Sequence, residues 1–369
     1  MASTAPPGRE QEIAVLREQI DALDAQLLAL MNARAGVARA IGELKKADGS
    51  PAFRPDREAA VIDGLKAKNP GPLPTDSVAP IWREIMSACR ALETPTRVAY
   101  LGPAGTFSEL AALGYFGSSI VKVLCANADE VFHATSAGAA DFGVVPVENS
   151  SEGVVTRSLD LFLTTPLIIV GETSLYVRHN LLRRIDSTEG IVAVCAHPQA
   201  LAQCHAWLSH HLPHAERRPV ASNAEGARLA SLDPSLAGIA SDRAASEFGL
   251  HLVAPAIQDD AHNRTRFAVV AHPDVHPQPK ATGHDCTSLV ASVPNRPGAV
   301  HDMLVPLKRH GVSMTRFESR PARSGQWEYY FYVDLQGHPD QPEVAAALQE
   351  LREVSSFFKL LGTYPVDSH

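Results

Sequence analysis

Three basic residues on one long predicted helix have the spacing to bind a small dianion. Residues 10–46 contain Arg17, Arg34 and Lys45, with no proline among them. Lys45 follows Arg34 by about three helical turns, so both side chains face the same direction. Arg17 precedes Arg34 by roughly 25 Å along the axis, so no small molecule touches both from one helix. In an antiparallel helix pair, Arg17 of a second copy would lie opposite Arg34, and the pocket would have cations from two subunits.

An apolar seam on the same helix is the reason to expect a second copy. Its members alternate in steps of three and four, which is typical of a helix that packs against another along its length. The seam consists of Ile13, Leu16, Ile20, Leu23, Leu27, Leu30, Val37, Ile41 and Leu44, with Arg34 as its charged position. A charge there is costly unless an anion meets it, although an arginine can also extend to solvent or pair with a carboxylate. Shorter helices over 55–68 and 76–93 complete an all-α domain, residues 1–95, expected to form a homodimer or a higher homo-oligomer.

The sequence period changes at residue 97, where strands begin to alternate with helices. The strand VAYL is followed by the glycine-rich turn GPAGT and a helix-forming run. Such a turn at a helix N-terminus offers N–H groups to an anion, although many turns of this kind only reverse the chain. A second strand runs into the polar turn ENSSEG. The alternation predicts an α/β domain over 96–275 with mainly parallel sheets. Two lobes with a cleft between them are expected over 97–173 and 174–254, with a return over 255–272.

The C-terminal residues follow a proline-rich linker and have a different element order. Strand, helix, strand, strand, helix and strand are expected over 287–293, 297–311, 312–321, 328–337, 342–354 and 357–364. This βαββαβ order predicts a ferredoxin-like domain over 284–369.

The bulk composition excludes several classes of protein. The 369 residues are 45% hydrophobic with a net charge of -8, which argues for a globular protein and against nucleic acid as a partner. The five cysteines form no CxxC pair, and neither GxGxxG nor GK[ST] occurs, so we expect no metal and no cofactor. The N-terminus lacks a signal-peptide core, and no apolar run reaches the ~20 residues of a membrane span. A cytoplasmic location without membrane contact is therefore expected.

The helical domain resembles the all-helical, intertwined-dimer chorismate mutases. The resemblance rests on LREQIDALDAQLLALMNARAGVARAIGELK, RPDRE and IWREIMSACRALE, which match the starts or bodies of three helices. It implies that chorismate, a dicarboxylate, rearranges to prephenate without a covalent intermediate, in a site that holds a folded conformer and stabilises charge on the ether oxygen. The implied residues are Arg34 and Arg17 of the partner subunit as carboxylate clamps, Lys45 and Glu93 at the ether oxygen, Glu58 at the ring hydroxyl and Arg57 as support.

Two positions, Glu93 and Arg54, differ from residues found in some chorismate mutases. Glu93 stands where some members have glutamine, and a glutamate can donate a hydrogen bond to the ether oxygen only when it is protonated. Mutase activity is therefore expected to fall as the pH rises above neutral, unless the pocket keeps Glu93 neutral. Arg54 stands where some members have an aspartate that contributes to the ligand site. Without the resemblance, Arg57 and Glu58 would be interpreted as a solvated helix face.

The α/β domain resembles the prephenate dehydratases through VAYLGPAGTFSE, GVVPVENSSEG, AHPQAL and NRTRF, in that order. The implied reaction removes water and carbon dioxide and forms an aromatic ring, so one proton donor and correct orientation suffice. Thr265 is the implied donor to the departing hydroxyl, with Arg266 at a carboxylate and Phe267 shaping the pocket. The other implied binding residues are Gly102, Gly105, Thr106 and Ser108 at a helix start and Asn149 and Ser150 at the opposing turn. Alone, TRF is only an alternating strand, and His197 is expected to begin a helix rather than act as a base.

The C-terminal domain resembles the ACT regulatory domains of dehydratases. Its two signatures are Gly298-Ala299-Val300 and Glu318-Ser319-Arg320-Pro321. The resemblance implies that L-phenylalanine is an effector, and feedback inhibition requires it to bind a less active state more tightly. A packing domain without a ligand is the alternative.

The order of the three domains resembles the bifunctional chorismate mutase–prephenate dehydratase family of phenylalanine biosynthesis, which combines an isomerase and a carbon–oxygen lyase. Two alternatives remain open at this point. The first is a monofunctional dehydratase whose helical domain only dimerises, which the departure at Arg54 motivates. The second is a solute-binding or sensor protein, since the two-lobed fold of periplasmic binding proteins and the ACT domain both serve that role.

Overall fold

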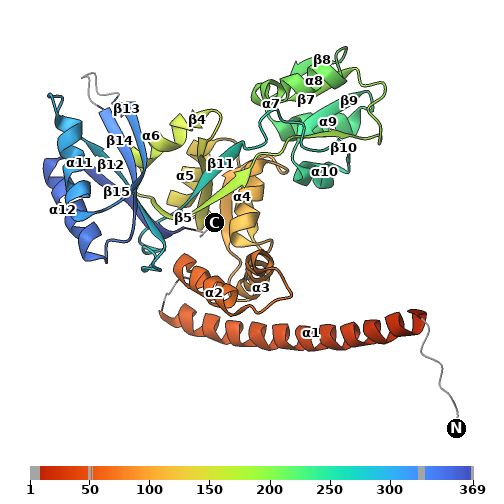
Figure 1. Ribbon diagram of the computed structural model, residues 1–369, viewed down its shortest axis with the longest axis horizontal. Helices are drawn as coiled ribbons and strands as arrows, with labels where there is room; N and C mark the ends of the chain where they lie inside the picture. The colour runs from red at the N-terminus through yellow and green to blue at the C-terminus, as the bar shows by residue number, and fades with distance from the viewer. Residues whose placement is uncertain (1–8, 49–50, 52, 323–328, 367–369) are drawn as a thin grey trace, which may run out of the picture.

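The computed structural model describes residues 9–48, 51, 53–322 and 329–366 (Figure 1). Within these ranges the chain forms a helical N-terminal domain, a two-lobed α/β domain and a C-terminal α/β domain with a single sheet. The three predicted domain types are all present. No helix of the described residues combines the length and the apolar character that crossing a lipid bilayer requires.

The N-terminal domain consists of one very long helix and two short ones. Its elements are α1 (Arg9–Asp48), α2 (Pro55–Lys68), the 3-10 turn η1 (Thr75–Ser77) and α3 (Val78–Ala91). Pro55 occupies the first turn of α2, where its missing N–H costs no hydrogen bond. Much of α1 extends beyond α2 and α3 without covering by any other element (Figure 1).

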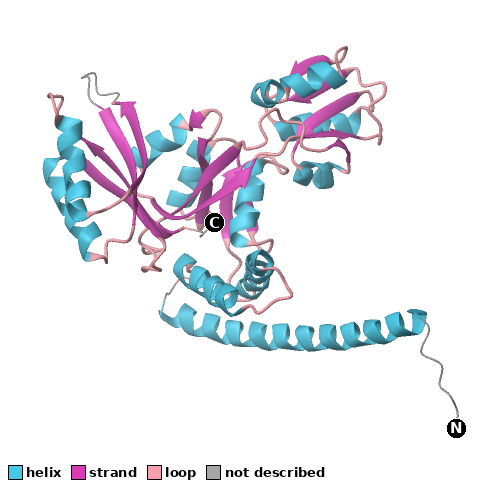
Figure 2. Cartoon of the chain, viewed as in Figure 1, coloured by secondary structure: helices cyan, strands magenta, loops and turns pink. Residues whose placement is uncertain are grey.

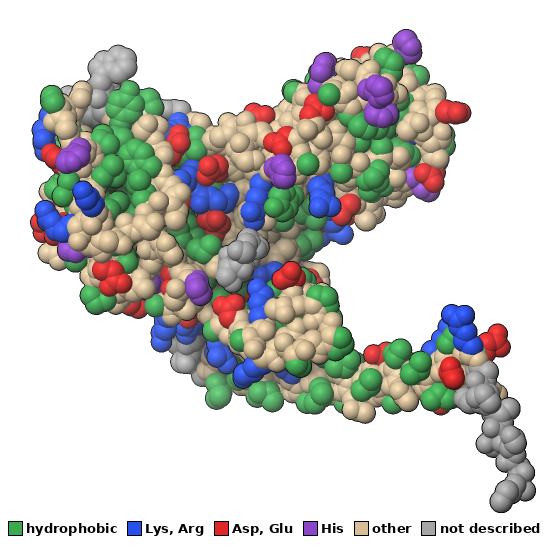
Figure 3. Space-filling model, in the orientation of Figure 1, with side chains coloured by type: hydrophobic (Ala, Val, Ile, Leu, Met, Phe, Trp, Pro, Cys, Tyr) green, Lys and Arg blue, Asp and Glu red, His purple; other side chains and the backbone are tan. Residues whose placement is uncertain are grey.

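The apolar seam of α1 is exposed along the helix. Its nine apolar members have between 41% and 73% of their surface accessible, and Figure 3 shows hydrophobic side chains repeating along α1. Ile81 of α3 and Leu92, the residue directly after α3, are exposed as well. A contiguous apolar surface of this length is typical of a protein–protein contact, because a lone helix gains nothing from an apolar stripe in water.

The two-lobed domain contains two separate sheets flanked by helices (Figure 2). The first lobe comprises β1 (Arg97–Leu101), α4 (Phe107–Phe116), β2 (Val121–Cys125), α5 (Ala128–Ser136), β3 (Phe142–Asn149), β4 (Gly153–Val154), α6 (Thr156–Thr164), β5 (Ile168–Tyr176) and β11 (Arg264–Ala271). The second comprises β6 (Asn180–Arg183), β7 (Ala193–Ala196), α7 (Pro198–Gln203), α8 (His205–His211), β8 (Glu216–Pro219), α9 (Asn223–Leu232), β9 (Leu236–Ala240), α10 (Asp242–Phe248) and β10 (His251–Ala254).

Both sheets are mixed, so the prediction of mainly parallel sheets was wrong. The first has the order β2-β1-β3-β11-β5, in which β11 runs antiparallel to β3 and β5. The second has the order β10-β6-β9-β7-β8, in which β6 runs antiparallel to β9 and β10. The cause is the connection between lobes: the chain leaves the first lobe after β5 and returns as β11, which inserts between β3 and β5.

The C-terminal domain has the predicted βαββαβ order. Its elements are β12 (Asp285–Ser292), α11 (Ala299–His310), β13 (Met314–Pro321), β14 (Tyr329–Gln336), α12 (Pro342–Val354) and β15 (Phe357–Pro365). The sheet order is β13-β14-β12-β15, which leaves β13 at an edge.

The three domains share apolar cores rather than meeting only at linkers. The ring of Phe53, from the connection between α1 and α2, packs against Phe116 and Phe142 of the first lobe at centroid distances of 4.9 and 5.2 Å. On the other side of the first lobe, one core cluster combines its buried residues with Val290, Tyr332 and others of the C-terminal domain. Burial of this kind fixes how the domains sit against each other.

Candidate active sites

A cavity of about 640 Å³ lies where α1, α2 and α3 meet. It brings together residues that are widely separated in the sequence. Its lining includes five of the six residues expected for the mutase, namely Arg34, Lys45, Arg57, Glu58 and Glu93. These five residues, three cations and two acids, suit a small molecule with two carboxylates and a hydroxyl.

Arg17 is the sixth expected mutase residue, and it does not line this cavity. It is exposed in the N-terminal part of α1. Because a straight helix separates Arg17 from Arg34 by about 25 Å, one chain cannot bring them together.

Glu58 is held in the cavity by Arg90, a residue that the sequence analysis did not single out. Nη1 of Arg90 donates to Glu58 Oε1. Burial raises the pKa of Glu58, while Arg90, Arg83 and Arg34 favour its charged form and oppose that rise. The sequence offers no local signal for Arg90, because its partners Glu58 and Phe116 lie 32 and 26 residues away.

Glu93 enters the cavity across a glycine of α1. A Cβ atom at Gly42 would lie 2.6 Å from Glu93 Cγ, so this crossing requires a residue without a side chain. Glu93 Oε2 is buried, has no hydrogen-bond partner among the described residues and lies 3.9 Å from Lys45 Nζ. A carboxyl oxygen in this position can meet a ligand atom.

The departure at Arg54 is partly offset by its neighbour. Arg54 Nε donates to Asp56 Oδ1 over 3.2 Å, and both residues line the cavity. A carboxylate is therefore present near this wall, although at a different sequence position. Lys280, from the segment before the C-terminal domain, also contributes to the lining.

A second cavity, of about 340 Å³, lies between the two lobes of the α/β domain. Its lining residues also come from motifs that are far apart in the sequence. Of the predicted dehydratase residues, those lining it are Gly105, Thr106, Ser108, Asn149 and Thr265. The cavity has a polar wall from the first lobe and contributions from α7 and from the turns before α9 and α10.

Thr265 and Asn149 are joined by a hydrogen bond whose direction is determined by their surroundings. Asn149 Oδ1 accepts from the backbone N–H groups of Ser151 and Glu152, both over 3.1 Å. The amide nitrogen of Asn149 consequently donates to Asn263 Oδ1 and to Thr265 Oγ1, each over 2.8 Å. Because Thr265 Oγ1 accepts here, its own proton is available to a molecule in the cavity.

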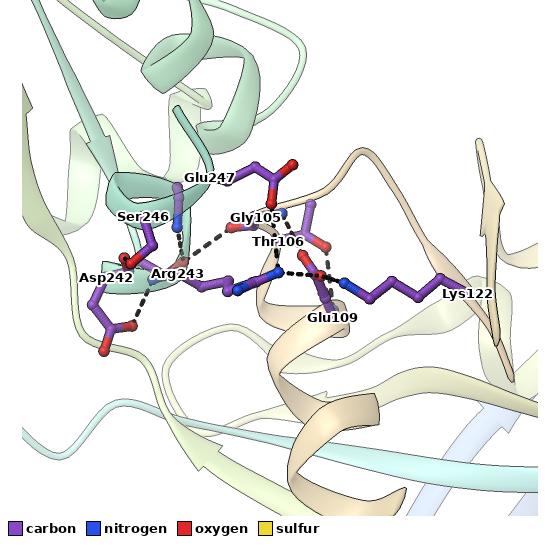
Figure 4. Close-up of polar contacts among 10 residues, drawn as sticks. Gly105, Thr106, Glu109, Lys122, Asp242, Arg243, Ser246 and Glu247 are labelled. Atoms are coloured by element: carbon purple, nitrogen blue, oxygen red, sulfur yellow. Dashed lines mark hydrogen bonds and ion pairs between the residues drawn. The ribbon is translucent and has the colours of Figure 1, made fainter. Parts of the chain in front are cut away.

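The start of α4 is organised by a fully buried carboxylate, Glu109 (Figure 4). Glu109 accepts from Gly105 N and from Lys122 Nζ, both over 2.6 Å, and Arg243 Nη2 of the second lobe lies 3.3 Å away. Burial disfavours its charge, but these three donors outweigh burial and lower the pKa of Glu109. The network therefore ties the first lobe to α10 at the edge of the cavity.

Gly105 brings the two lobes close together beside this network. Its carbonyl accepts from Ser241 Oγ over 2.9 Å, its φ is +86°, and an added Cβ atom would lie 3.1 Å from Ala244 Cα. Glycine is the residue that tolerates both the left-handed backbone and the close approach.

Arg266 does not line the inter-lobe cavity, contrary to the expectation that it contacts a substrate carboxylate. Successive side chains of β11 alternate between faces, so Arg266 points away from Thr265 toward the C-terminal domain. Its guanidinium lies 2.9 Å from Asp334 Oδ2 of β14 and 3.2 Å from Glu172 Oε2 of β5. Burial opposes its charge, but Glu172 and Asp334 raise the pKa of Arg266.

Three other expected residues lie next to the cavity rather than in its lining. Phe267 is buried in the core cluster against which Phe107, a lining residue, packs. Gly102 donates its N–H to Cys125 O over 2.9 Å. Ser150 Oγ accepts from Arg264 N over 2.9 Å and so holds the turn after β3 against β11.

Two histidines line the inter-lobe cavity in different roles. His197 Nδ1 accepts from Gln199 N at the start of α7, as expected for a residue that begins a helix. His179, which the sequence analysis missed, lies 3.0 Å from Gln203 Oε1 and contacts Phe107 edge-on. Burial lowers the pKa of His179, which favours its neutral form. Its position just after β5 carries no motif that could have marked it.

The two ACT signatures lie on different elements of the C-terminal domain. Gly298 caps α11 with a φ of +81°, followed by buried Ala299 and exposed Val300. Residues 318–321 belong to the edge strand β13. Within that strand, Arg320 reaches the α/β domain, where Nη1 donates to Thr156 O over 3.0 Å.

Models of three known protein families match consecutive parts of the chain. "Chorismate mutase type II" matches residues 16–94, "Prephenate dehydratase" matches 98–275 and "ACT domain" matches 287–353. These segments coincide with the helical, two-lobed and C-terminal domains.

Similar proteins span almost the entire chain. A bifunctional chorismate mutase/prephenate dehydratase of Neisseria gonorrhoeae is 48% identical over 352 residues, covering 95% of this chain and 96% of that protein. The protein of the same description from Aquifex aeolicus is 40% identical, covering 96% and 98%. A prephenate dehydratase structure from Arthrobacter aurescens, in complex with L-Phe, is 33% identical with a TM-score of 0.68, covering 73% of this chain and 90% of that one. The chain belongs to the family of bifunctional chorismate mutase/prephenate dehydratases.

Proposed function

We propose that the helical cavity is the chorismate mutase site and that the inter-lobe cavity is the prephenate dehydratase site. As a member of its family the chain is both an isomerase and a lyase: it converts chorismate to prephenate and prephenate to phenylpyruvate. The domains that carry these activities are residues 1–95 and 96–275, with a regulatory domain over 284–369. Support comes from the matching family segments, from the charged side chains that line the helical cavity and from the polar side chains that line the inter-lobe cavity.

In the mutase site, the single observation that carries the assignment is the convergence of Arg34, Lys45 and Glu58 on one cavity. Arg34 binds a carboxylate, Lys45 and Glu93 face the ether oxygen, and Glu58 accepts from the ring hydroxyl. Arg57 supports the wall. The rearrangement is unimolecular, so holding the reactive conformer and meeting its developing charge supply the catalysis.

The second carboxylate clamp is Arg17 of the partner subunit in a homodimer. The exposed seam of α1 gives the contact, and an antiparallel pairing places Arg17 opposite Arg34. A mixing experiment tests this. Arg17→Ala and Arg34→Ala homodimers should each be inactive as mutases, whereas a mixed dimer contains one intact site and regains about half of the activity per dimer. Failure of the mixture to regain activity, with exchange of subunits verified, would reject the shared site.

In the dehydratase site, Thr265 donates a hydrogen bond to the departing hydroxyl of prephenate while the carboxylate leaves as carbon dioxide. The hydrogen bond from Asn149 orients Thr265, and the start of α4, where Thr106 and Ser108 line the cavity, is the proposed site for an anionic group of the substrate. Aromatisation supplies the driving force, so orientation and one donor suffice.

The C-terminal domain binds L-phenylalanine and lowers dehydratase activity. Support comes from the match to the ACT family and from the similar Arthrobacter dehydratase in complex with L-Phe. Calorimetry with L-phenylalanine at millimolar concentration, with D-phenylalanine as the control, tests binding. Absence of any L-phenylalanine signal would reject this role.

One set of assays separates the bifunctional enzyme from its alternatives. Chorismate should yield prephenate, prephenate should yield phenylpyruvate, and L-phenylalanine should slow the second conversion. A monofunctional dehydratase would leave chorismate unchanged, and a solute-binding protein would leave both compounds unchanged.

We also propose a cytoplasmic location, since all five cysteines are buried free thiols, as is usual in a reducing compartment. Cell fractionation checks this.

A further inference from the structure

The guanidinium of Arg90 contacts three separate segments of the chain at once. Nη1 donates to Glu58 of α2, and Nη2 donates to the carbonyl of Phe116, over 2.5 Å, at the end of α4. Its Cζ atom lies 4.6 Å above the ring centre of Phe53. The side chain is only 5% exposed and lines the mutase cavity. One cation therefore touches both the helical domain and the α/β domain.

The contact with Phe116 is part of a wider docking face on α3. Glu84, Ser87 and Arg90 follow one another at three-residue spacing, so they share one side of the helix. Glu84 accepts from Ser118 N over 3.1 Å, and Ser87 Oγ accepts from Ser119 N over 3.1 Å. Backbone groups at the C-terminal end of α4 and in the turn after it thus form hydrogen bonds with side chains of the helical domain. A cation at this end is also favoured by the helix dipole.

Arginine suits this position for a geometric reason. Its planar fork presents donors in different directions, so the same group can serve a carboxylate on one side and a carbonyl on the other. A lysine ammonium is a single point of charge on a flexible stem. A buried cation without both partners would also be costly, so the two acceptors and the charge support each other.

We propose that Arg90 is a positioning residue for the mutase reaction, which holds Glu58 in the mutase cavity from the C-terminal end of α4 in the dehydratase domain. The inference rests on the proposed role of Glu58. It makes the dehydratase domain a structural part of the mutase site. The same helix reaches the other site, because Phe107 and Ser108 at its N-terminal end line the inter-lobe cavity.

A double-substitution cycle in the full-length chain tests this. Arg90→Met should lower mutase kcat/KM about tenfold in the wild-type background but less than about twofold in a Glu58→Gln background, because the residue acts through Glu58. Glu84→Ala is the matched control: it removes a neighbouring docking contact without touching Glu58 and should leave mutase kcat/KM within about twofold. Retained dehydratase turnover reports that each variant has folded.

If Arg90→Met does not fold, Arg90→Lys takes its place in the cycle. Lysine keeps the charge but reaches one acceptor, so we expect about a threefold loss that again disappears in the Glu58→Gln background. The proposal is overturned by equal losses in the two backgrounds, by no loss at all, or by equal losses in Arg90→Met and Glu84→Ala. If Glu58→Gln alone leaves mutase activity intact, the assignment of Glu58 fails and the proposal fails with it. If Glu58→Gln does impair the mutase, but the losses from the Arg90 and Glu58 substitutions simply add, only the Arg90 proposal is rejected.

Discussion

The amide nitrogen of Asn149 lies 2.8 Å from Thr265 Oγ1 and donates a hydrogen bond to it. Both residues line the inter-lobe cavity, from the neighbouring strands β3 and β11. The direction of this bond follows from the two backbone N–H groups that occupy Asn149 Oδ1. It leaves the Thr265 hydroxyl with one free proton, which is what a donor to a departing hydroxyl needs.

Thr265→Ala should lower dehydratase kcat about 10²-fold or more, because it removes the hydrogen-bond donor to the departing hydroxyl. Thr265→Ser keeps the hydroxyl and should retain part of the rate. Mutase turnover of chorismate, measured on the same preparations, should be unaffected, since the two cavities share no residue. Full dehydratase turnover in Thr265→Ala would contradict the assignment.

Asn149→Ala should lower both dehydratase kcat and stability. It frees the Thr265 hydroxyl to rotate and leaves the N–H groups of Ser151 and Glu152 without their acceptor, at a cost of about 1–3 kcal/mol. Ser151→Ala, in the same turn, serves as the control because its hydroxyl makes only a 3.4 Å contact with Asp260. Thermal unfolding and prephenate turnover measure the two effects. Indistinguishable behaviour of the two variants would show that Asn149 does not orient Thr265.

Glu93→Ala should lower mutase kcat/KM about tenfold or more, because it removes a buried carboxyl group that lies beside Lys45 in the mutase cavity. Glu93→Gln keeps a hydrogen-bonding group of the same size and should retain more of the activity. Chorismate turnover measures both effects, and dehydratase turnover on the same preparations should be unchanged. Unchanged mutase kcat/KM in Glu93→Ala would contradict the role of Glu93.

Asp334→Asn should weaken inhibition by L-phenylalanine more than it weakens binding. Asp334 of the C-terminal domain pairs with Arg266, the neighbour of Thr265 in β11, so neutralising it removes a direct link between the effector domain and the catalytic strand. Inhibition curves and calorimetry on one preparation separate the two quantities. Arg309→Ala, which breaks an exposed pair with Glu350, should change neither. Normal inhibition in Asp334→Asn would exclude this link.

Glu109→Gln should lower the thermal midpoint at neutral pH but not in acid. Because the pKa of Glu109 is lowered from its ordinary 4.5, its stabilising contribution is present above that value and is lost as the pH falls through the lower folded value. The gap in midpoint between wild type and variant should therefore close well below pH 4.5. Glu247→Gln removes an exposed partner of the same Arg243 and should have a small effect at any pH. If the difference in thermal midpoint persists in acid, the effect of Glu109→Gln comes from packing and not from charge.

The sequence by itself determined the helices of the N-terminal domain, the order of the three domains and the element order of the C-terminal domain. The reason is that these are local: the seam of α1, the Pro55 start of α2 and the βαββαβ order depend on periodicity and on turn residues close in the chain. Thr265 and Asn149 were found through short motifs, but their hydrogen bond was not, because it depends on β11 returning beside β3.

Only the tertiary structure decided which side chains of one domain contact which side chains of another. Arg266 was expected at a substrate carboxylate, yet the alternation of β11 directs it to Asp334 once the C-terminal domain covers that side. Arg90 gave no signal at all, since its two acceptors come from other elements. The packing of Phe53 into the first lobe and the presence of Lys280 in the mutase cavity have the same origin. Contacts between distant segments depend on how apolar faces bury one another, and a linear pattern records which faces are apolar but not which of them meet.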